Sequence, residues 1–127
     1  MKTNPDFEKR PWGSYEVLSR SKLVSAVGAS SDIVIKKITI ESGKRVSYQS
    51  HNGRAEHWYV VSGSGVAVVD GVGREVREGD SVDVPLKTKH RIGSSGKESL
   101  VFIEIATGTV DEGDIIRYED DFGRVNQ

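Results

Sequence analysis

Residues 48–61 read YQSHNGRAEHWYVV, and they govern the interpretation of the whole chain. Asn52 and Gly53 lie between two strand-like runs, and an Asn-Gly pair in this setting is the strongest short-range signal for a β-hairpin, because both central positions of a type I′ turn need positive φ. We therefore predict that Asn52 and Gly53 form a two-residue turn that pairs the strand before it with the strand after it.

Side chains alternate between the two faces of a strand, so this turn sorts the stretch into two sets. One predicted face carries Gln49, His51, Arg54, Glu56, Trp58 and Val60, and the other carries Ser50, Ala55, His57 and Tyr59. Polar groups on a face shared with tryptophan and valine need partners. A divalent cation suits imidazole nitrogen together with carboxylate and amide oxygen. We predict a metal site here, with a polar surface hairpin as the open alternative, and His90 as a candidate fourth ligand.

Outward from this stretch the chain consists of short strand-like runs punctuated by glycine. The predicted strands are residues 33–40, 45–51, 57–61, 65–70, 74–77, 81–84 and 99–105. Regular short strands favour an all-β antiparallel sandwich or small barrel over alternating βαβ units. Residues 1–16 are expected to form an ordered arm and residues 20–31 a loop, and the acidic residues 111–121 are expected to hold one short strand or turn.

Composition limits the function classes. The 127 residues fit a single domain, and 18 basic against 19 acidic residues give a net charge of −1, which argues against a nucleic-acid partner. No apolar run of about 18 residues occurs, and residues 1–6 lack the apolar core of a signal peptide, so we expect a cytoplasmic protein without a membrane partner. The chain has no cysteine, so any metal must be held by His, carboxylate or amide ligands.

Two spaced motifs resemble those of the cupin superfamily: Gly43 followed by His51, Glu56 and Gly63, and Gly79 followed by Pro85 and His90. Further stretches resemble type II phosphomannose isomerase over about residues 8–124. These are residues 10–16 (RPWGSYE), 54–58 (RAEHW), 60–63 (VVSG), 90–91 (HR) and 114–124 (DIIRYEDDFGR). The chain departs from the family pattern at His51-Asn52-Gly53, where the family usually has a run of histidines, and at Pro85-Leu86-Lys87.

The resemblance implies a cupin jelly roll, with an arm at 1–16, a barrel at about 17–107 and a tail at 108–127. In the family this domain usually follows a mannose-1-phosphate guanylyltransferase, for which no glycine-rich phosphate loop is present here, so we expect a stand-alone isomerase that forms a homodimer. The implied metal ligands are Gln49, His51, Glu56 and His90. Zinc is the first expectation for the metal, with manganese, cobalt, iron and nickel as alternatives.

The implied activity interconverts mannose 6-phosphate and fructose 6-phosphate through a cis-enediol. Glu104, a carboxylate in an otherwise apolar strand, and Arg54 are the candidate catalytic residues, and a metal-bound hydroxide is the rival base. The phosphate needs cationic donors. The candidates are Arg54, Arg91, Lys89 and Arg117, with Arg124 also in the tail. Two other functions stay open: a cupin that binds a sugar phosphate without catalysis, and a metal-dependent oxygenase.

Overall fold

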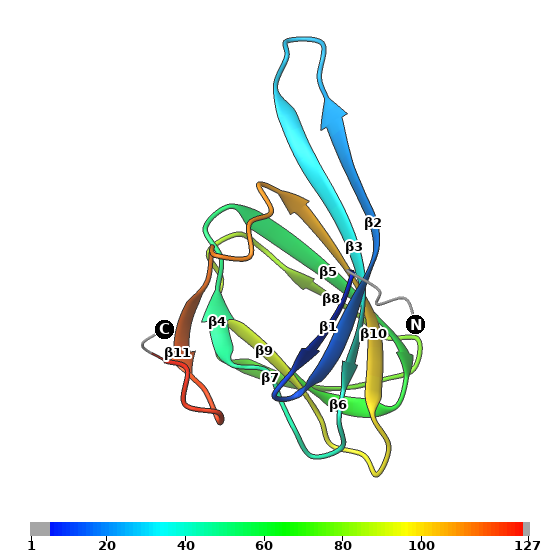
Figure 1. The fold of residues 1–127 in the computed structure, drawn as a ribbon. Coiled ribbons are helices and arrows are strands. Elements are labelled where there is room, and N and C mark those ends of the chain that lie inside the picture. The colour runs from blue at the N-terminus through cyan, green and yellow to red at the C-terminus, as the bar shows by residue number, and fades with distance from the viewer. Residues whose placement is uncertain (1–5, 126–127) are drawn as a thin grey trace.

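Two antiparallel sheets face each other in the computed structural model, which describes residues 6–125 (Figure 1). One sheet has the strand order β1 (Phe7–Arg10), β2 (Gly13–Val24), β3 (Ser30–Ile40), β10 (Leu100–Gly108), β5 (Arg54–Ser62) and β8 (Ser81–Val84). The other has the order β11 (Ile116–Glu119), β4 (Tyr48–Ser50), β9 (His90–Ser94), β6 (Ser64–Val69) and β7 (Val72–Arg77). The predicted all-β antiparallel class is confirmed. Across the described part of the chain, no helix has the length and apolar character needed to cross a membrane.

The inward face of the central strands changes character along its length. At one end Leu100 pairs with Ile40 in register, and both are fully buried in the apolar core. Two residues further along β10 comes Phe102, and two further comes Glu104, which pairs with Lys36 of β3. Strand alternation keeps all of these side chains on one face. Charged side chains therefore follow the apolar core along this inward face, with buried Ala106 and Val34 beyond them, and the charged stretch forms the candidate site.

The predicted hairpin at Asn52-Gly53 is wrong. Strand β4 pairs with β9 and β11, whereas β5 pairs with β10 and β8, so the Asn-Gly pair crosses from one sheet to the other. Neither Asn52 nor Gly53 has positive φ. Their backbone N–H groups instead donate to the Asp114 carboxylate, at 2.9 and 2.8 Å. Glycine is needed because a Cβ at position 53 would lie 2.9 Å from the Thr109 carbonyl oxygen.

The N-terminal region contains more strand than the sequence predicted. Residues 7–10 and 13–24 form β1 and β2, so the expected loop at 20–31 shrinks to residues 25–29. The β2–β3 hairpin projects beyond the sheets in Figure 1. Residues 19–22 of β2 are polar on both faces, so the sequence shows no apolar alternation there. Trp12 at the β1–β2 turn packs into the core. The first five residues of the expected arm and the last two of the expected tail lie outside the described residues.

Candidate metal centre

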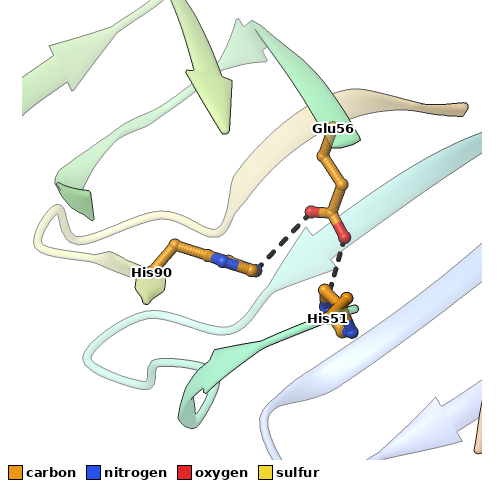
Figure 2. A group of neighbouring side chains, drawn as sticks. All are labelled: His51, Glu56 and His90. Carbon is orange, nitrogen blue, oxygen red and sulfur yellow. Dashed lines mark ion pairs between the residues drawn. The ribbon is translucent and has the colours of Figure 1, made fainter. Parts of the chain in front are cut away.

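Three buried side chains from different strands meet at the charged stretch of the interior. His51 follows β4 directly, Glu56 is on β5, and His90 is the first residue of β9 (Figure 2). One ligand atom from each lies within 4.8 Å of the others. The side chains are 2 to 3% exposed. The structure thus brings together three of the four predicted metal ligands in a geometry that one small cation could bridge.

Hydrogen bonds fix the tautomer of both imidazoles. The Nδ1 of His51 lies 2.6 Å from the carbonyl oxygen of Asp114, and the Nδ1 of His90 lies 2.8 Å from that of Thr88. A carbonyl oxygen only accepts, so each Nδ1 carries the hydrogen and each Nε2 presents a lone pair. Both Nε2 atoms face the Glu56 carboxylate (Figure 2). The Nε2 of His51 lies 3.3 Å from one of its oxygens, and the Nε2 of His90 lies 3.8 Å from the other.

Burial also keeps these imidazoles neutral. Burial, with the nearby Arg54 charge, lowers the pKa of His51 from 6.5 to about 4. Burial likewise lowers the pKa of His90. A neutral imidazole with an unprotonated Nε2 and a carbonyl on Nδ1 is the form in which histidine binds a metal. Both histidines are therefore prepared as ligands at neutral pH.

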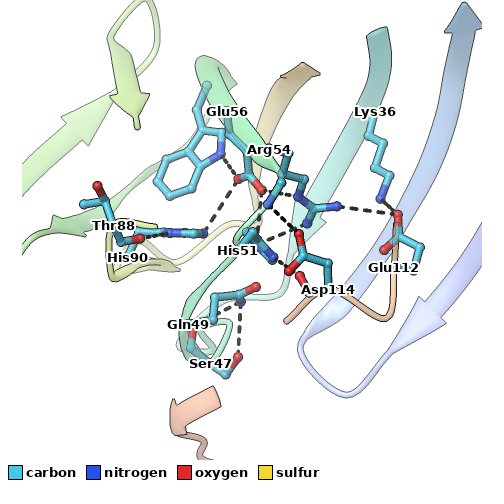
Figure 3. Close-up of polar contacts among 12 residues, drawn as sticks. Lys36, Ser47, Gln49, His51, Arg54, Glu56, Thr88, His90, Glu112 and Asp114 are labelled. Carbon is cyan, nitrogen blue, oxygen red and sulfur yellow. Dashed lines mark hydrogen bonds and ion pairs between the residues drawn. The ribbon is translucent and has the colours of Figure 1, made fainter. Parts of the chain in front are cut away.

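The fourth predicted ligand, Gln49, lines the same cavity. Its Nε2 donates to the carbonyl oxygen of Ser47 at 3.2 Å and to the Ser47 hydroxyl at 3.1 Å (Figure 3). This leaves the amide oxygen, the atom that a metal would take, without a hydrogen bond from these groups. Two imidazole nitrogens, a carboxylate and an amide oxygen form a donor set that suits zinc, manganese, iron or cobalt. The residues present fit the implied metal.

The Glu56 carboxylate is held from two further sides. Trp58 donates its indole N–H to one oxygen at 3.0 Å, and Arg54 donates Nε–H to the other at 3.0 Å. A second nitrogen of Arg54, Nη2, lies 3.2 Å from the Nε2 of His51, while its buried Nη1 has no hydrogen-bond partner among the described residues. These contacts orient Glu56 toward the histidines and leave Arg54 with an unused donor in the cavity.

A further carboxylate, Glu104, lies beside this cluster on β10 and lines the cavity. Burial raises the pKa of Glu104, and the neighbouring Glu56 charge raises it further. A carboxyl whose pKa is moved toward neutrality can both accept and return a proton. The structure therefore places the predicted catalytic residues Glu104 and Arg54 in the same cavity as the metal ligands.

The predicted phosphate-binding residues divide into two groups. Arg54, Arg117 and Arg124 line the cavity, and Arg117 has a buried Nε without a hydrogen-bond partner among the described residues. Arg91 and Lys89 do not line it. Arg91 follows the inward-facing His90, so alternation turns it to the opposite face of the sheet, where its Nε donates to the Val46 carbonyl. Lys89 lies over the Tyr118 ring, 4.2 Å from its centroid.

Sequence reasoning missed three charged residues of the cavity wall: Arg10, Lys36 and Glu112. Lys36 is an inward residue of β3, and its ammonium lies 2.6 Å from the Glu112 carboxylate (Figure 3). The alternation Val34, Lys36, Ile38, Ile40 would have placed Lys36 inside, so its signal was present in the sequence. Glu112 belongs to the segment between β10 and β11, and nothing in its sequence context marks it.

Comparison with known proteins identifies the family. The family model described as "Mannose-6-phosphate isomerase C-terminal" matches residues 4–120. The chain belongs to this family. The chain is 35% identical over 117 residues to the mannose-1-phosphate guanylyltransferase ManC of Salmonella typhimurium, covering 91% of this chain and 22% of ManC. It is 38% identical over 116 residues to the alginate biosynthesis protein AlgA of Pseudomonas aeruginosa, again 91% of this chain and 22% of the relative. This member of the mannose-6-phosphate isomerase C-terminal family thus spans less than a quarter of these relatives.

Solved structures confirm the fold predicted for this family member. An RmlC-like cupin from Shewanella frigidimarina superposes with a TM-score of 0.66 at 21% identity, covering 84% of this chain and 86% of the cupin. The capsular polysaccharide assembling protein CapF of Staphylococcus aureus superposes with a TM-score of 0.74 at 19% identity, covering 89% of this chain and 34% of CapF. The predicted cupin jelly roll is therefore confirmed, and the resemblance to type II phosphomannose isomerase is confirmed at the level of the family.

Proposed function

We propose that this chain interconverts mannose 6-phosphate and fructose 6-phosphate with the help of a divalent metal, zinc being the first candidate. The observation that carries the proposal is the juxtaposition, in one cavity, of two prepared imidazoles, the Glu56 carboxylate and the separate buried carboxyl of Glu104. Membership of a family described by this isomerase supports the choice of substrate.

The reaction moves one carbon-bound proton between neighbouring carbons of the open-chain sugar. A base removes the proton at C2 of the aldose while the carbonyl oxygen O1 takes up a proton, which gives the cis-enediol. The O2 hydroxyl then loses its proton as a proton is returned to C1, which gives the ketose. A divalent metal supplies Lewis acidity that stabilises negative charge on the two sugar oxygens. In the proposal Glu104 takes and returns the carbon-bound proton, a role that a pKa raised toward neutrality favours.

Two arginines of the cavity are the candidates for contact with the substrate region in this proposal. Arg54 contacts both Glu56 and His51 through Nε and Nη2, so it would hold these two groups in place beside the sugar oxygens. Arg117, with its unpaired Nε, is a candidate for contact with the substrate. Because Arg91 and Lys89 do not line the cavity, the proposal leaves them out of substrate binding.

The test is formation of fructose 6-phosphate from mannose 6-phosphate by the purified chain, with zinc, manganese or cobalt added and a chelator as control. We expect metal-dependent turnover that falls roughly 10²- to 10⁴-fold in Glu104→Gln, the range for loss of a general base. Glu98→Gln is the matched control, because Glu98 is an exposed glutamate outside the cavity. Sugar-phosphate binding without turnover under every metal would contradict the proposal in favour of a non-catalytic cupin. Oxygen uptake with iron would contradict it in favour of an oxygenase.

A further inference from the structure

A lysine is buried in the cavity wall and depends on a single carboxylate. The Lys36 side chain is 5% exposed, and its Nζ lies 2.6 Å from an oxygen of Glu112. The ammonium also lies over the Tyr15 ring, 4.4 Å from its centroid. An aromatic face gives only a weak attraction to a cation, whereas burying an unpaired ammonium is costly. Lys36 therefore needs an anion at this place in the cavity.

The Glu112 carboxylate also faces a buried donor of Arg54 that has no hydrogen bond in the described part of the chain. The Nη1 of Arg54 lies 3.8 Å from Glu112, too far for a hydrogen bond, and has no other hydrogen-bond partner among the described residues. The Arg54 side chain is 8% exposed, so water cannot readily supply the missing hydrogen bond to Nη1. One carboxylate thus faces two buried cations: it pairs with Lys36 and leaves the Nη1 donor of Arg54, whose Nε is paired with Glu56, without a hydrogen bond within residues 6–125.

Glu112 itself is not a fixed part of the cavity wall. Its side chain is 60% exposed, although it reaches the two buried cations. The backbone on either side is anchored, since Val110 donates to the Asp32 carboxylate and the Asp114 carboxylate accepts from Gly53. Rotation of the Glu112 side chain into water would therefore vacate the space beside Lys36 and Arg54 without moving the segment.

We propose that Lys36 and Arg54 form an anion-binding subsite, and that the Glu112 carboxylate fills it until an incoming phosphate group displaces it. A phosphate dianion carries more charge than a carboxylate and has three acceptor oxygens, enough for both Lys36 and the unused Arg54 donor. The subsite adjoins the metal cavity, because Lys36 pairs in register with Glu104. The inference rests on the proposed function only in taking the natural ligand to be a sugar phosphate.

The experiment measures binding of inorganic phosphate to the full chain by calorimetry, in zinc-loaded protein and again in chelator. Glu112→Gln removes the competing charge, so we expect phosphate to bind roughly 3- to 10-fold more tightly, as for release of a partly exposed ion pair. Glu119→Gln is the matched control. It removes the same charge from β11, where Glu119 faces Arg91 outside the cavity, and it should leave the affinity unchanged.

Lys36→Met should weaken phosphate binding by about tenfold or more, since a charge-assisted contact is lost. Unchanged phosphate affinity in a folded Glu112→Gln protein would overturn the proposal. Because this variant leaves the buried Lys36 ammonium without its carboxylate, its fold is checked first by circular dichroism, and if the fold is lost the phosphate affinity of Lys36→Met decides alone. Phosphate binding abolished by Arg117→Gln but retained in Lys36→Met would also overturn it, by placing the anion at the other end of the cavity. Because phosphate binding needs no turnover, failure of the isomerase proposal would appear separately, as tight binding without isomerisation.

Discussion

Replacing Asp114 by alanine should weaken metal binding although Asp114 is not a ligand. Its carboxylate accepts the backbone N–H groups of Asn52 and Gly53, and its carbonyl oxygen accepts from His51 Nδ1. The two N–H donors lower the pKa of Asp114, so it is ionised at neutral pH. The residue therefore ties the sheet-to-sheet crossing to the segment that orients His51.

The size of the effect follows from the contacts. A hydrogen bond to a charged group contributes about 1.5 to 3 kcal/mol, and loss of one leaves a buried donor unpaired. The Asn52 N–H is exposed and can turn to water, so only the Gly53 bond, which is partly buried, counts in full. Metal binding would then have to supply about 2 kcal/mol to order the Asn52-Gly53 crossing, which corresponds to a roughly 30-fold loss in metal affinity. This lies within the 10- to 100-fold range for partners that orient metal ligands.

The assay is competition for zinc against a chromophoric chelator at pH 7. Asp111→Ala is the control on the same segment, because within residues 6–125 the Asp111 carboxylate accepts only the Gly113 N–H and has no hydrogen bond to the crossing. Asp114→Asn keeps one oxygen acceptor and should fall between wild type and Asp114→Ala. Equal zinc affinity in the Asp114→Ala and Asp111→Ala proteins would refute the reasoning, whatever their melting temperatures.

Three further predictions test the ligand assignment, the buried imidazole and the core. His51→Ala should abolish stoichiometric zinc binding measured by elemental analysis, whereas His57→Ala, whose exposed ring contacts Asp83, should keep the metal, and the reverse pattern would disprove the assignment. Because the pKa of His51 is lowered from 6.5 to about 4 in the folded protein, His51 of the unfolded chain takes up a proton at a higher pH. The free energy of unfolding of the metal-free protein should therefore fall by up to about 3 kcal/mol as the pH falls through that range. Urea unfolding in chelator should show a larger loss in wild type than in His51→Ala, which keeps only the contribution of the other groups with shifted pKa values, His90 among them. Leu100→Ala should cost about 2 to 5 kcal/mol in the same assay, because Leu100 is fully buried in the core, while Leu18→Ala, half exposed, should cost under about 0.5 kcal/mol.

Strands with a strong alternation were predictable, and those stabilised mainly by their neighbours were not. Residues 81–84 form β8 with the predicted bounds, and residues 33–40 form most of β3. The missed strand β2 has polar residues on both faces over residues 19–22, and it is a strand because it pairs with β3 along most of its length. Local sequence carries no record of such a pairing.

The hairpin predicted at Asn52-Gly53 is wrong for a similar reason, because a distant residue determines the conformation of this turn. The pair satisfies every local rule for a hairpin, but the acceptor that determines its conformation is Asp114, 61 residues after Gly53 in the chain. The predicted face nevertheless holds in part, since Gln49, His51, Arg54 and Glu56 all line one cavity. Alternation within each strand depends only on backbone geometry, so it is unaffected when the two strands belong to different sheets.

The placement of charge in the interior links the fold to the chemistry. The apolar residues of the central strands supply the burial that holds the jelly roll together, and the same strands carry Lys36, Glu56 and Glu104 on their inward face. Buried charges of this kind stabilise a fold less than apolar side chains of equal volume would. A ligand that binds only the folded protein offsets such a cost, by about 2.7 kcal/mol at 100 times its dissociation constant. A cation among His51, Glu56 and His90 and an anion beside Lys36 would each do so, which makes the folded stability of this chain a direct readout of whether its site is filled.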